Sequence, residues 1–419
     1  MHPVLEEVLE RAGKVANRLK LLELRETTGV ALRVIRGGRI GLASTSRLDD
    51  LGTLVANAVE LAQFGPEARL ELPGGTTYPE VPVYDPAVEA LPVEALVELG
   101  QRAIDRIRRA NSELVCSAHL SKGLNTVAIA NTRGAHVTYT KSGFGVFLEA
   151  TLVQGTDMLF IWEGKASCSA DTQMDDMVGS VLRQLELARA VAPAPAGEVP
   201  VLFAPRGVAG VLLTPLLAGF NGRTVYQKAS PLVDRLGQQV LGPQFSLYDD
   251  PTLAYAAGAR MCDDEGVPTR RTPLVEGGVV RSFLYDLQTA AEMGVESTGS
   301  AHRSLSTMPS PGASVVVIPP GDTPYDDLLA GMERGLVVER LLGAGQSNIL
   351  GGDFNANVLL GYAVEGGRIV GRVKDTLIAG NVYKVLSAIE GMSRETRWVG
   401  GFAHVPAILC RGVSVATQA

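Results

Sequence analysis

A compact group of charged side chains lies in the segment 263–274, DDEGVPTRRTPL. Its carboxylates and guanidinium groups are residue types that can bind a peptide through charge-assisted hydrogen bonds. The same carboxylates can instead cap a turn or pair with the nearby arginines, and the glycine can supply the positive φ of a tight turn. Both interpretations stay open at this point. The candidate peptide-binding residues of this segment are Asp264, Glu265, Gly266, Arg270 and Arg271.

Histidine and cysteine, the other common residues of catalytic and metal sites, are sparse. None of the five histidines stands at metal-ligand spacing from another. The four cysteines form no CxxC pair, which argues against a disulfide framework or a zinc knuckle. Cys262 stands beside two aspartates, which favour the protonated thiol. No Gly-x-Ser-x-Gly elbow is present, so nothing points to a nucleophilic hydrolase site.

The segment 206–240 predicts the central helix of the second half of the chain, because its leucines recur at three- and four-residue spacing. Pro215 lacks an N–H and would clash with the carbonyl of Val211. The helix must therefore kink there or restart with Thr214 as its N-cap. Gly219 loosens the far end.

This helix resembles the motif helix of the TldD/PmbA family of metallopeptidases. In the metal-bearing branch of that family the helix reads Gly-Ile-Leu-Leu-His-Glu-x-x-x-His. On residues 210–219 the first His falls on Thr214, the Glu on Pro215 and the second His on Gly219. The third family ligand, a Cys, falls around Trp398–Gly401, where this chain has none.

A catalytic zinc needs about three N, O or S ligands and an open water position. Pro and Gly side chains supply no ligand, and a Thr hydroxyl is a poor one. The resemblance therefore implies a chain without the metal site, and no cofactor is expected.

Four strings of the C-terminal half follow the family in the same order. The segment 263–274 resembles D-D-E-G-x-x-x-x-R-x-x-L, and MGVESTGSAHR, GGDFNANVLLGYAVEGGRI and TLIAGN follow it. The third string adds Gly352 and Asp353 to the candidate peptide-binding residues. The N-terminal half agrees with the family in layout and has weaker motifs.

Length and composition fit two globular domains. The chain has 419 residues, 46% hydrophobic and 20% charged, and no apolar run long enough for a membrane helix. Its first residues, MHPVLEEVLERAGK, do not resemble a signal peptide, so the cytoplasm is the expected compartment. A net charge of −7 argues against direct nucleic-acid binding.

Periodicity predicts an α+β fold. The N-terminal domain, 1–191, is expected to be an α/β-sandwich-like unit with an antiparallel sheet and long helices. Its predicted elements are a helix over 2–24, a hairpin about Gly37–Gly38, a helix from Asp49 or Asp50 to Gln63, a helix over 92–110, a meander over 114–162 and a helix over 171–191.

The Ala-Pro segment 192–197 is the predicted linker. The C-terminal domain, 198–419, is expected to be mainly β. A hairpin about Gly277–Gly278 and glycine-punctuated runs over 335–381 predict a curved sheet or partial barrel around the central helix.

The resemblance implies a function at the level of a complex. Members of the zinc-less branch, called PmbA or TldE, pair with a zinc-bearing TldD-type paralogue in a cytoplasmic peptidase that acts on small or unfolded peptides. We therefore expect this chain to be the partner subunit, and a homodimer when alone, because open sheet edges need pairing. The alternatives are a regulatory or peptide-binding protein without hydrolytic role and a self-sufficient non-metal hydrolase.

Overall fold

The computed structural model describes residues 19–171, 173–344 and 347–417. Most of the predicted first helix lies outside the described residues. Within them, residues 19–29 form no regular secondary structure. Leu21 and Leu24 are exposed there, and a short helix that buries no apolar face has little to stabilise it. The prediction that this helix continues to Leu24 is therefore wrong.

The predicted hairpin follows. Strands β1 (Val30–Arg36) and β2 (Arg39–Thr45) pair antiparallel across Gly37 and Gly38, whose φ values of 57° and 75° require glycine. Helix α2 (Leu51–Leu61) packs beside them and begins at Asp50, whose carboxylate accepts from Thr53 N at 3.1 Å. Both elements are confirmed.

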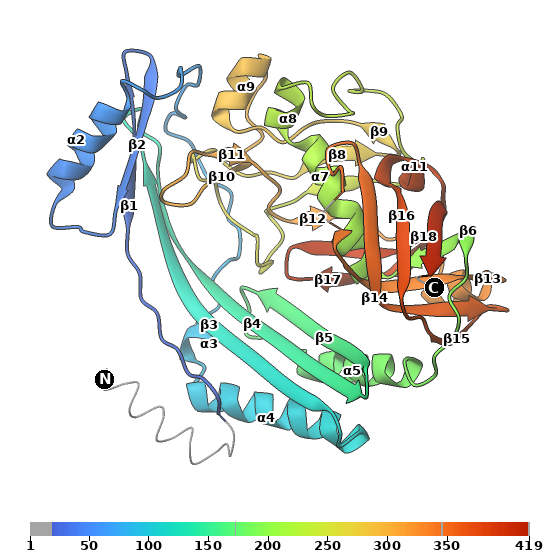
Figure 1. Cartoon of the computed structure of the whole chain (residues 1–419). Coiled ribbons are helices and arrows are strands. Elements are labelled where there is room, and N and C mark those ends of the chain that lie inside the picture. Colours follow the sequence, from blue (N-terminus) through green and yellow to red (C-terminus); the bar gives the residue numbers. More distant parts are fainter. Residues whose placement is uncertain (1–18, 172, 345–346, 418–419) are drawn as a thin grey trace.

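A three-stranded antiparallel sheet dominates the N-terminal half: β3 (Val115–Ala130), β4 (His136–Gln154) and β5 (Asp157–Ser167). Figure 1 shows α4 (Val93–Ala110) and α5 (Met174–Leu187) beneath the sheet. The short helix α3 (Pro86–Ala90) precedes them. The buried side chains of β4 alternate along the strand at Phe144, Val146, Leu148 and Ala150.

The predicted meander is built from fewer and longer strands than expected. Residues 136–142 and 145–155 were expected as separate runs, yet β4 passes through both. Gly143 pairs with Gly123, and Gly145 pairs with Ser121, so the ladder continues across the glycines. The glycines act as small residues within a long strand, and only the turn at Gly155 ends it.

A closed five-stranded barrel forms the centre of the C-terminal half. Strand β6 (Gly197–Phe203) pairs with β13 (Arg334–Leu342), β13 with β14 (Asp353–Glu365), β14 with β16 (Thr376–Asn381), β16 with β18 (Ala403–Thr417), and β18 with β6. The predicted partial barrel is confirmed and is in fact closed, which confirms the α+β class.

Shorter elements extend this barrel sheet or cover it. The strands are β7 (Leu247–Asp249), β8 (Thr272–Glu276), β9 (Val279–Val280), β12 (Val316–Val317), β15 (Arg368–Arg372) and β17 (Ile389–Val399), with β10 (Ala301–His302) and β11 (Ser310–Pro311) as a separate pair. The helices are α8 (Gly222–Tyr226), α9 (Leu287–Met293), α10 (Tyr325–Ala330) and α11 (Val382–Ser387). None of the described helices is long and apolar enough to cross a membrane.

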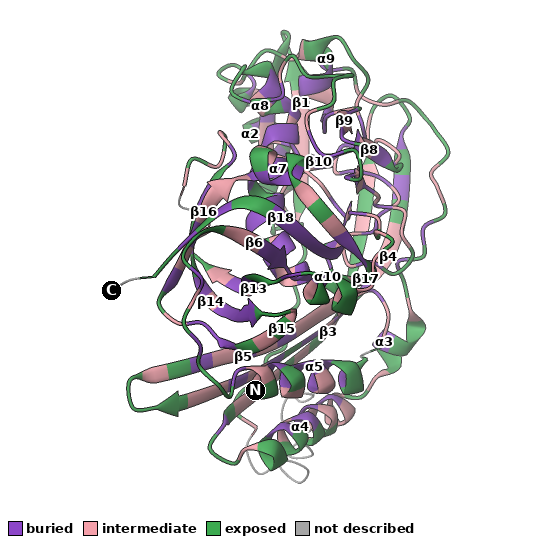
Figure 2. Cartoon of the chain, turned by 90° about the vertical axis from the view of Figure 1, so that its right-hand side faces the viewer, coloured by how far each residue is buried: buried purple, intermediate pink, exposed green. Residues whose placement is uncertain are grey.

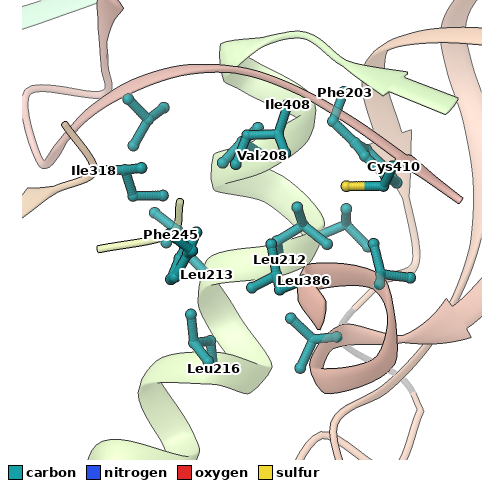
Figure 3. Close-up of a cluster of buried hydrophobic side chains, with 14 of the residues drawn as sticks. Phe203, Val208, Leu212, Leu213, Leu216, Phe245, Ile318, Leu386, Ile408 and Cys410 are labelled. Atoms are coloured by element: carbon teal, nitrogen blue, oxygen red, sulfur yellow. The ribbon is translucent and has the colours of Figure 1, made fainter. Parts of the chain in front are cut away.

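The largest apolar core surrounds the central helix, which runs through α6 (Pro205–Gly207), a π-helical turn (Val208–Leu212) and α7 (Leu213–Phe220). Figure 2 shows buried positions at the end of β6 and along much of β18. In Figure 3 the helix side chains lie among residues of the surrounding strands and of α11. The labelled members are Phe203, Val208, Leu212, Leu213, Leu216, Phe245, Ile318, Leu386, Ile408 and Cys410.

A buried polar network joins the N-terminal sheet to the barrel. Arg206 pairs with Glu163 of β5 and, at 3.3 Å, with Glu339 of β13. Glu163 also accepts hydrogen bonds from Ser180 Oγ at 2.5 Å and Gln184 Nε2 at 2.7 Å. The charges are paired and hydrogen-bonded, as burial requires.

The predicted linker is not a free tether. Val191 forms a bridge with Arg372, and Ala192 N donates to the Arg372 carbonyl at 2.9 Å. Ala192 is buried in the barrel core. Backbone hydrogen bonds thus anchor a segment whose side chains offer little anchoring. The domain boundary placed here stays a prediction.

Replacing Arg206 with Ala should reduce the free energy of unfolding by roughly 3–5 kcal/mol, because Glu163 would be left buried without its charge partner. Arg189→Ala is the matched control: its ion pair with Glu186 is exposed and should contribute less than about 1 kcal/mol. Urea titration of both variants measures the difference. Similar small losses would show that the junction network does not hold the two halves together.

Candidate functional site

The central helix contains the first three positions of the family's metal motif, and its course differs from the prediction. The helical run continues through Pro215, and Thr214 does not cap it. The turn before the proline is widened instead: Leu213 N donates to Val208 O, five residues back. A π turn is a known way to insert a residue into a helix, often at functional sites. The expected restart with Thr214 as the N-cap is therefore wrong, and the expected kink at Pro215 stays a prediction.

The residues at the family's His, Glu and His positions differ in burial. Thr214 is exposed, whereas Pro215 and Gly219 are buried. A Cβ built on Gly219 would meet Tyr383 Oη at 2.2 Å and Leu232 Cδ1 at 3.5 Å. Because α7 is α-helical from Leu213 to Phe220, no widening between the two histidine positions brings them together.

The region of the family's third ligand, Trp398–Gly401, has other neighbours than the motif helix positions. Trp398 stacks on His404 across the β17–β18 pair, with ring centroids 4.9 Å apart. A Cβ on Gly401 would meet Ala166 O at 2.4 Å and Ala257 Cβ at 2.8 Å. Neither Trp398 nor Gly401 is among the nearest neighbours of a Cβ built on Gly219. The residues present therefore do not fit a zinc ion.

The described part of the chain also contains no other metal site: no three His, Cys, Asp or Glu side chains are grouped to hold an ion.

The acidic segment is organised by Asp263, which is fully buried. Its Oδ1 accepts from Glu265 N at 2.9 Å and Val267 N at 3.0 Å, and its Oδ2 accepts from Ala301 N at 3.0 Å. Gly266, with φ of 81°, closes this turn, as predicted. Asp263 therefore builds the loop on which the candidate residues stand.

The two candidate carboxylates bind partners far away in sequence. Glu265 forms an ion pair with Arg33 of β1 and accepts from Leu287 N at 2.7 Å. Asp264 accepts from Arg303 N at 2.8 Å. The expected pairing of these carboxylates with Arg270 or Arg271 is therefore wrong.

The two arginines make other contacts. Arg270 donates to Ser297 O at 2.8 Å, and the guanidinium of Arg271 lies 3.8 Å from the centre of the Tyr248 ring. Both arginines thus have partners other than the two carboxylates, which already accept hydrogen bonds from elsewhere.

Gly352 and Asp353 lie elsewhere, at the start of β14. Gly352 has φ of 84° and packs against Tyr383, and Asp353 Oδ1 accepts from Asn381 Nδ2 at 2.8 Å. These two residues and the acidic segment do not form one site. Peptide binding by any of them stays a prediction.

Burial sets the electrostatics around the acidic segment. It raises the pKa of Asp263 to about 7, with repulsion from Glu265 adding to the effect. Burial and the charge of Arg260 lower the pKa of His302 to about 4. Burial and the neighbouring Asp263 raise the pKa of Cys262 to about 12, so this thiol is no nucleophile at neutral pH.

Sequence reasoning missed a groove of about 390 Å³ that is lined by residues of β3, β4 and β5. Glycine, serine and alanine residues line much of the groove. Ala257, from the loop before the acidic segment, closes one side. The lining residues are Ser121, Lys122, Gly123, Lys141, Ser142, Gly143, Phe144, Gly145, Ala166, Ser167, Cys168 and Ala257.

Lys141 fixes the groove wall, because its Nζ donates to Ala257 O at 2.5 Å and Ala259 O at 2.8 Å. Burial lowers the pKa of this amine. The groove also lies beside the Gly401 turn, since Ala166 and Ala257 are the neighbours of Gly401. Small residues at alternate positions of paired strands, Ser121 and Gly123 opposite Gly145 and Gly143, are the sequence signal that could have revealed it.

Asp263→Asn should remove a pH dependence of stability. The folded pKa of about 7 exceeds the usual value near 4, so the carboxyl stabilises the fold at low pH and that contribution is lost as pH rises through 7. Between about pH 6.5 and 8.5 the wild-type free energy of unfolding should fall by roughly 1 kcal/mol from this group.

This pH range lies above the range in which His302 titrates, because the pKa of His302 is lowered to about 4. Urea titrations at several pH values measure the slope, and Asp264→Asn, which leaves Asp263 in place, is the control that keeps it. An unchanged slope in Asp263→Asn would mean that another group titrates.

Comparisons with known proteins agree with this architecture. Residues 196–417 match the PmbA/TldA metallopeptidase C-terminal domain, and residues 15–62 match PmbA/TldA metallopeptidase domain 1. The chain is 27% identical over 390 residues to Metalloprotease PmbA of Escherichia coli O157:H7, covering 90% of this chain and 82% of that protein. It is 25% identical over 409 residues to a metalloprotease of Methanothermobacter thermautotrophicus, covering 91% and 86%.

Among solved structures, TldE from Thermococcus kodakarensis superposes with a TM-score of 0.85 at 25% identity, covering 96% of this chain and 92% of that one. The C-terminal match alone spans more than half of the 419 residues. From the ordered strings, the barrel and these matches together, the chain belongs to the metallopeptidase-related TldD/PmbA family.

Proposed function

We propose that this chain is the metal-free subunit of a TldD/PmbA-type peptidase: it holds a small or unfolded peptide while a zinc-bearing TldD-type paralogue hydrolyses it. The observation that carries the proposal is the identity of the residues at the motif positions. Thr214, Pro215 and Gly219 do not supply a ligand set, and the described residues contain no substitute group.

The groove on the β3–β5 sheet supports peptide binding. Its small side chains offer few features that select a particular side chain of a bound peptide, which suits a peptide of variable sequence. Its end at Ala166 and Ala257 adjoins the Gly401 turn. A peptide in this groove would therefore pass next to the position of the family's third ligand.

Pairing with a second subunit has a different basis from the one first expected. The five barrel strands pair with one another and offer no open edge, so the edge argument there is limited to the outer strands β9, β15 and β17. Strand β3 does offer an open edge, because β4 is its only hydrogen-bonded neighbour among the described strands. We propose that a TldD-type paralogue is the physiological partner, with a homodimer forming when the chain is alone.

A peptide-binding protein without hydrolytic role would use the same groove. It would differ only in that mixing it with a zinc-bearing partner would not increase peptide cleavage. A self-sufficient non-metal hydrolase would cleave peptide alone and in the presence of a chelator. The raised pKa of the Cys262 thiol argues against this cysteine as the nucleophile of such a hydrolase.

The isolated chain should contain no stoichiometric transition metal, because its motif positions cannot ligate one. Elemental analysis of the full chain, purified without chelator and then dialysed against zinc, measures the content. One zinc retained per chain would overturn the proposal, since a subunit with its own closed metal site would not depend on a partner for hydrolysis.

Gly123→Leu should fill the groove without disturbing the fold, because a Cβ there meets nothing within 4 Å. Binding of a short, fluorescent, unstructured peptide, followed by anisotropy, should weaken on the order of tenfold or more.

Gly179→Leu in α5 is the matched control, since its Cβ is equally free and the residue is not among those that line the groove. Equal affinity of the two variants for the peptide would place the binding site elsewhere.

A further inference from the structure

Tyr383 is the second residue of α11 and lies between two glycines that come from distant parts of the chain. Its hydroxyl is 2.2 Å from an ideal Cβ on Gly219 of α7. Its Cδ2 and Cε2 atoms are both 2.6 Å from an ideal Cβ on Gly352. Real Cβ atoms do not approach other atoms so closely, so each glycine is required by the ring.

The hydroxyl of Tyr383 is buried and has no hydrogen-bond partner among the described residues. The nearest polar group on the helix, the Gly219 carbonyl, already accepts from Ser230 Oγ at 2.7 Å. Leaving a buried hydroxyl unsatisfied costs stability, so hydrogen bonding does not explain why a tyrosine stands here. The ring and its hydroxyl instead fill space against the helix.

Two of the family's sequence strings hold the ring in place. Asn381, the last residue of TLIAGN, caps α11 by accepting from Tyr383 N at 3.1 Å. Its Nδ2 donates to Gly351 O and to Asp353 Oδ1, both at 2.8 Å and both in the GGDF turn. The motif helix, the GGDF turn and the TLIAGN segment therefore meet at one aromatic ring.

We propose that Tyr383 occupies the space that a side chain at position 219 would need, so that this chain has closed the family's metal position by packing as well as by loss of ligands. The inference goes beyond the proposed function, because a chain that only lacked ligands would accept a larger residue at position 219. It is also independent of the metal content, since it concerns the packing of this chain's own residues.

The hydroxyl oxygen of Tyr383 is the atom that would clash with a Cβ at position 219, so removing this oxygen tests the proposal. In a Tyr383→Phe background, a Cβ at position 219 would have Cζ and Leu232 Cδ1 as its nearest neighbours, both at 3.5 Å, an ordinary contact distance. Alanine within a helix is otherwise more favourable than glycine. The effect of Gly219→Ala should therefore change sign with the residue at position 383.

The experiment is a double-mutant cycle on the full chain, read as the thermal unfolding midpoint. Gly219→Ala should lower the midpoint in the wild type and raise it in Tyr383→Phe. Gly210→Ala, in the same helical run with nothing within 4 Å of its Cβ, should have the same effect in both backgrounds.

A second pair uses a larger residue: Gly219→His should be less destabilising when combined with Tyr383→Ala than when introduced alone. If Gly219→His fails to fold, the alanine cycle still decides. Equal effects of Gly219→Ala in the two backgrounds would overturn the proposal.

Discussion

Packing of the central helix in the largest apolar core, against strands of the C-terminal half, is the constraint on which the other features depend. The five barrel strands satisfy their backbone hydrogen bonds by closing on themselves, and the central helix packs with them in one apolar core. The helix can approach β13 closely because a Cβ on Gly207 would lie 2.4 Å from Val338 O. The π turn and the glycine at position 219 are further adjustments of the same helix to its enclosure.

That enclosure also determines the chemistry available. The end of the helix where a related chain would hold a metal is packed against α11, and Thr214 alone of the three motif positions is exposed. A groove that could hold a peptide lies elsewhere, between the β3–β5 sheet and the loop through Ala257. The structure thus combines a closed motif helix with an open groove, which suits holding a peptide better than cleaving one.

Local signals in the sequence predicted local structure well. Two glycines at a tight turn marked both the β1–β2 hairpin and the β8–β9 hairpin, and Asp50 marked the start of α2. Ordered glycines also indicated the barrel, although not its closure. The hydrophobic pattern of β4 was correct, but its two glycines suggested a break where the ladder continues.

The rest could not be predicted because it depends on contacts between distant residues. Arg33 and Glu265 are separated by 232 positions, so local charge pairing favoured the wrong arginines. The groove arises only when β5 and the loop at Ala257 lie side by side. Likewise, Tyr383 carries no signal in its own segment, and its role becomes visible only against Gly219 and Gly352.

Under the proposed function, this chain binds peptide for a hydrolysis that occurs on another subunit. The most direct measurement is the rate of cleavage of a short unstructured peptide by this chain, by a zinc-bearing TldD-type paralogue and by their equimolar mixture, each with and without chelator. We expect no cleavage by this chain alone. The mixture should cleave the peptide faster than the paralogue does by itself, and chelation should stop this cleavage. Cleavage by this chain alone that survives chelation would contradict the proposed function.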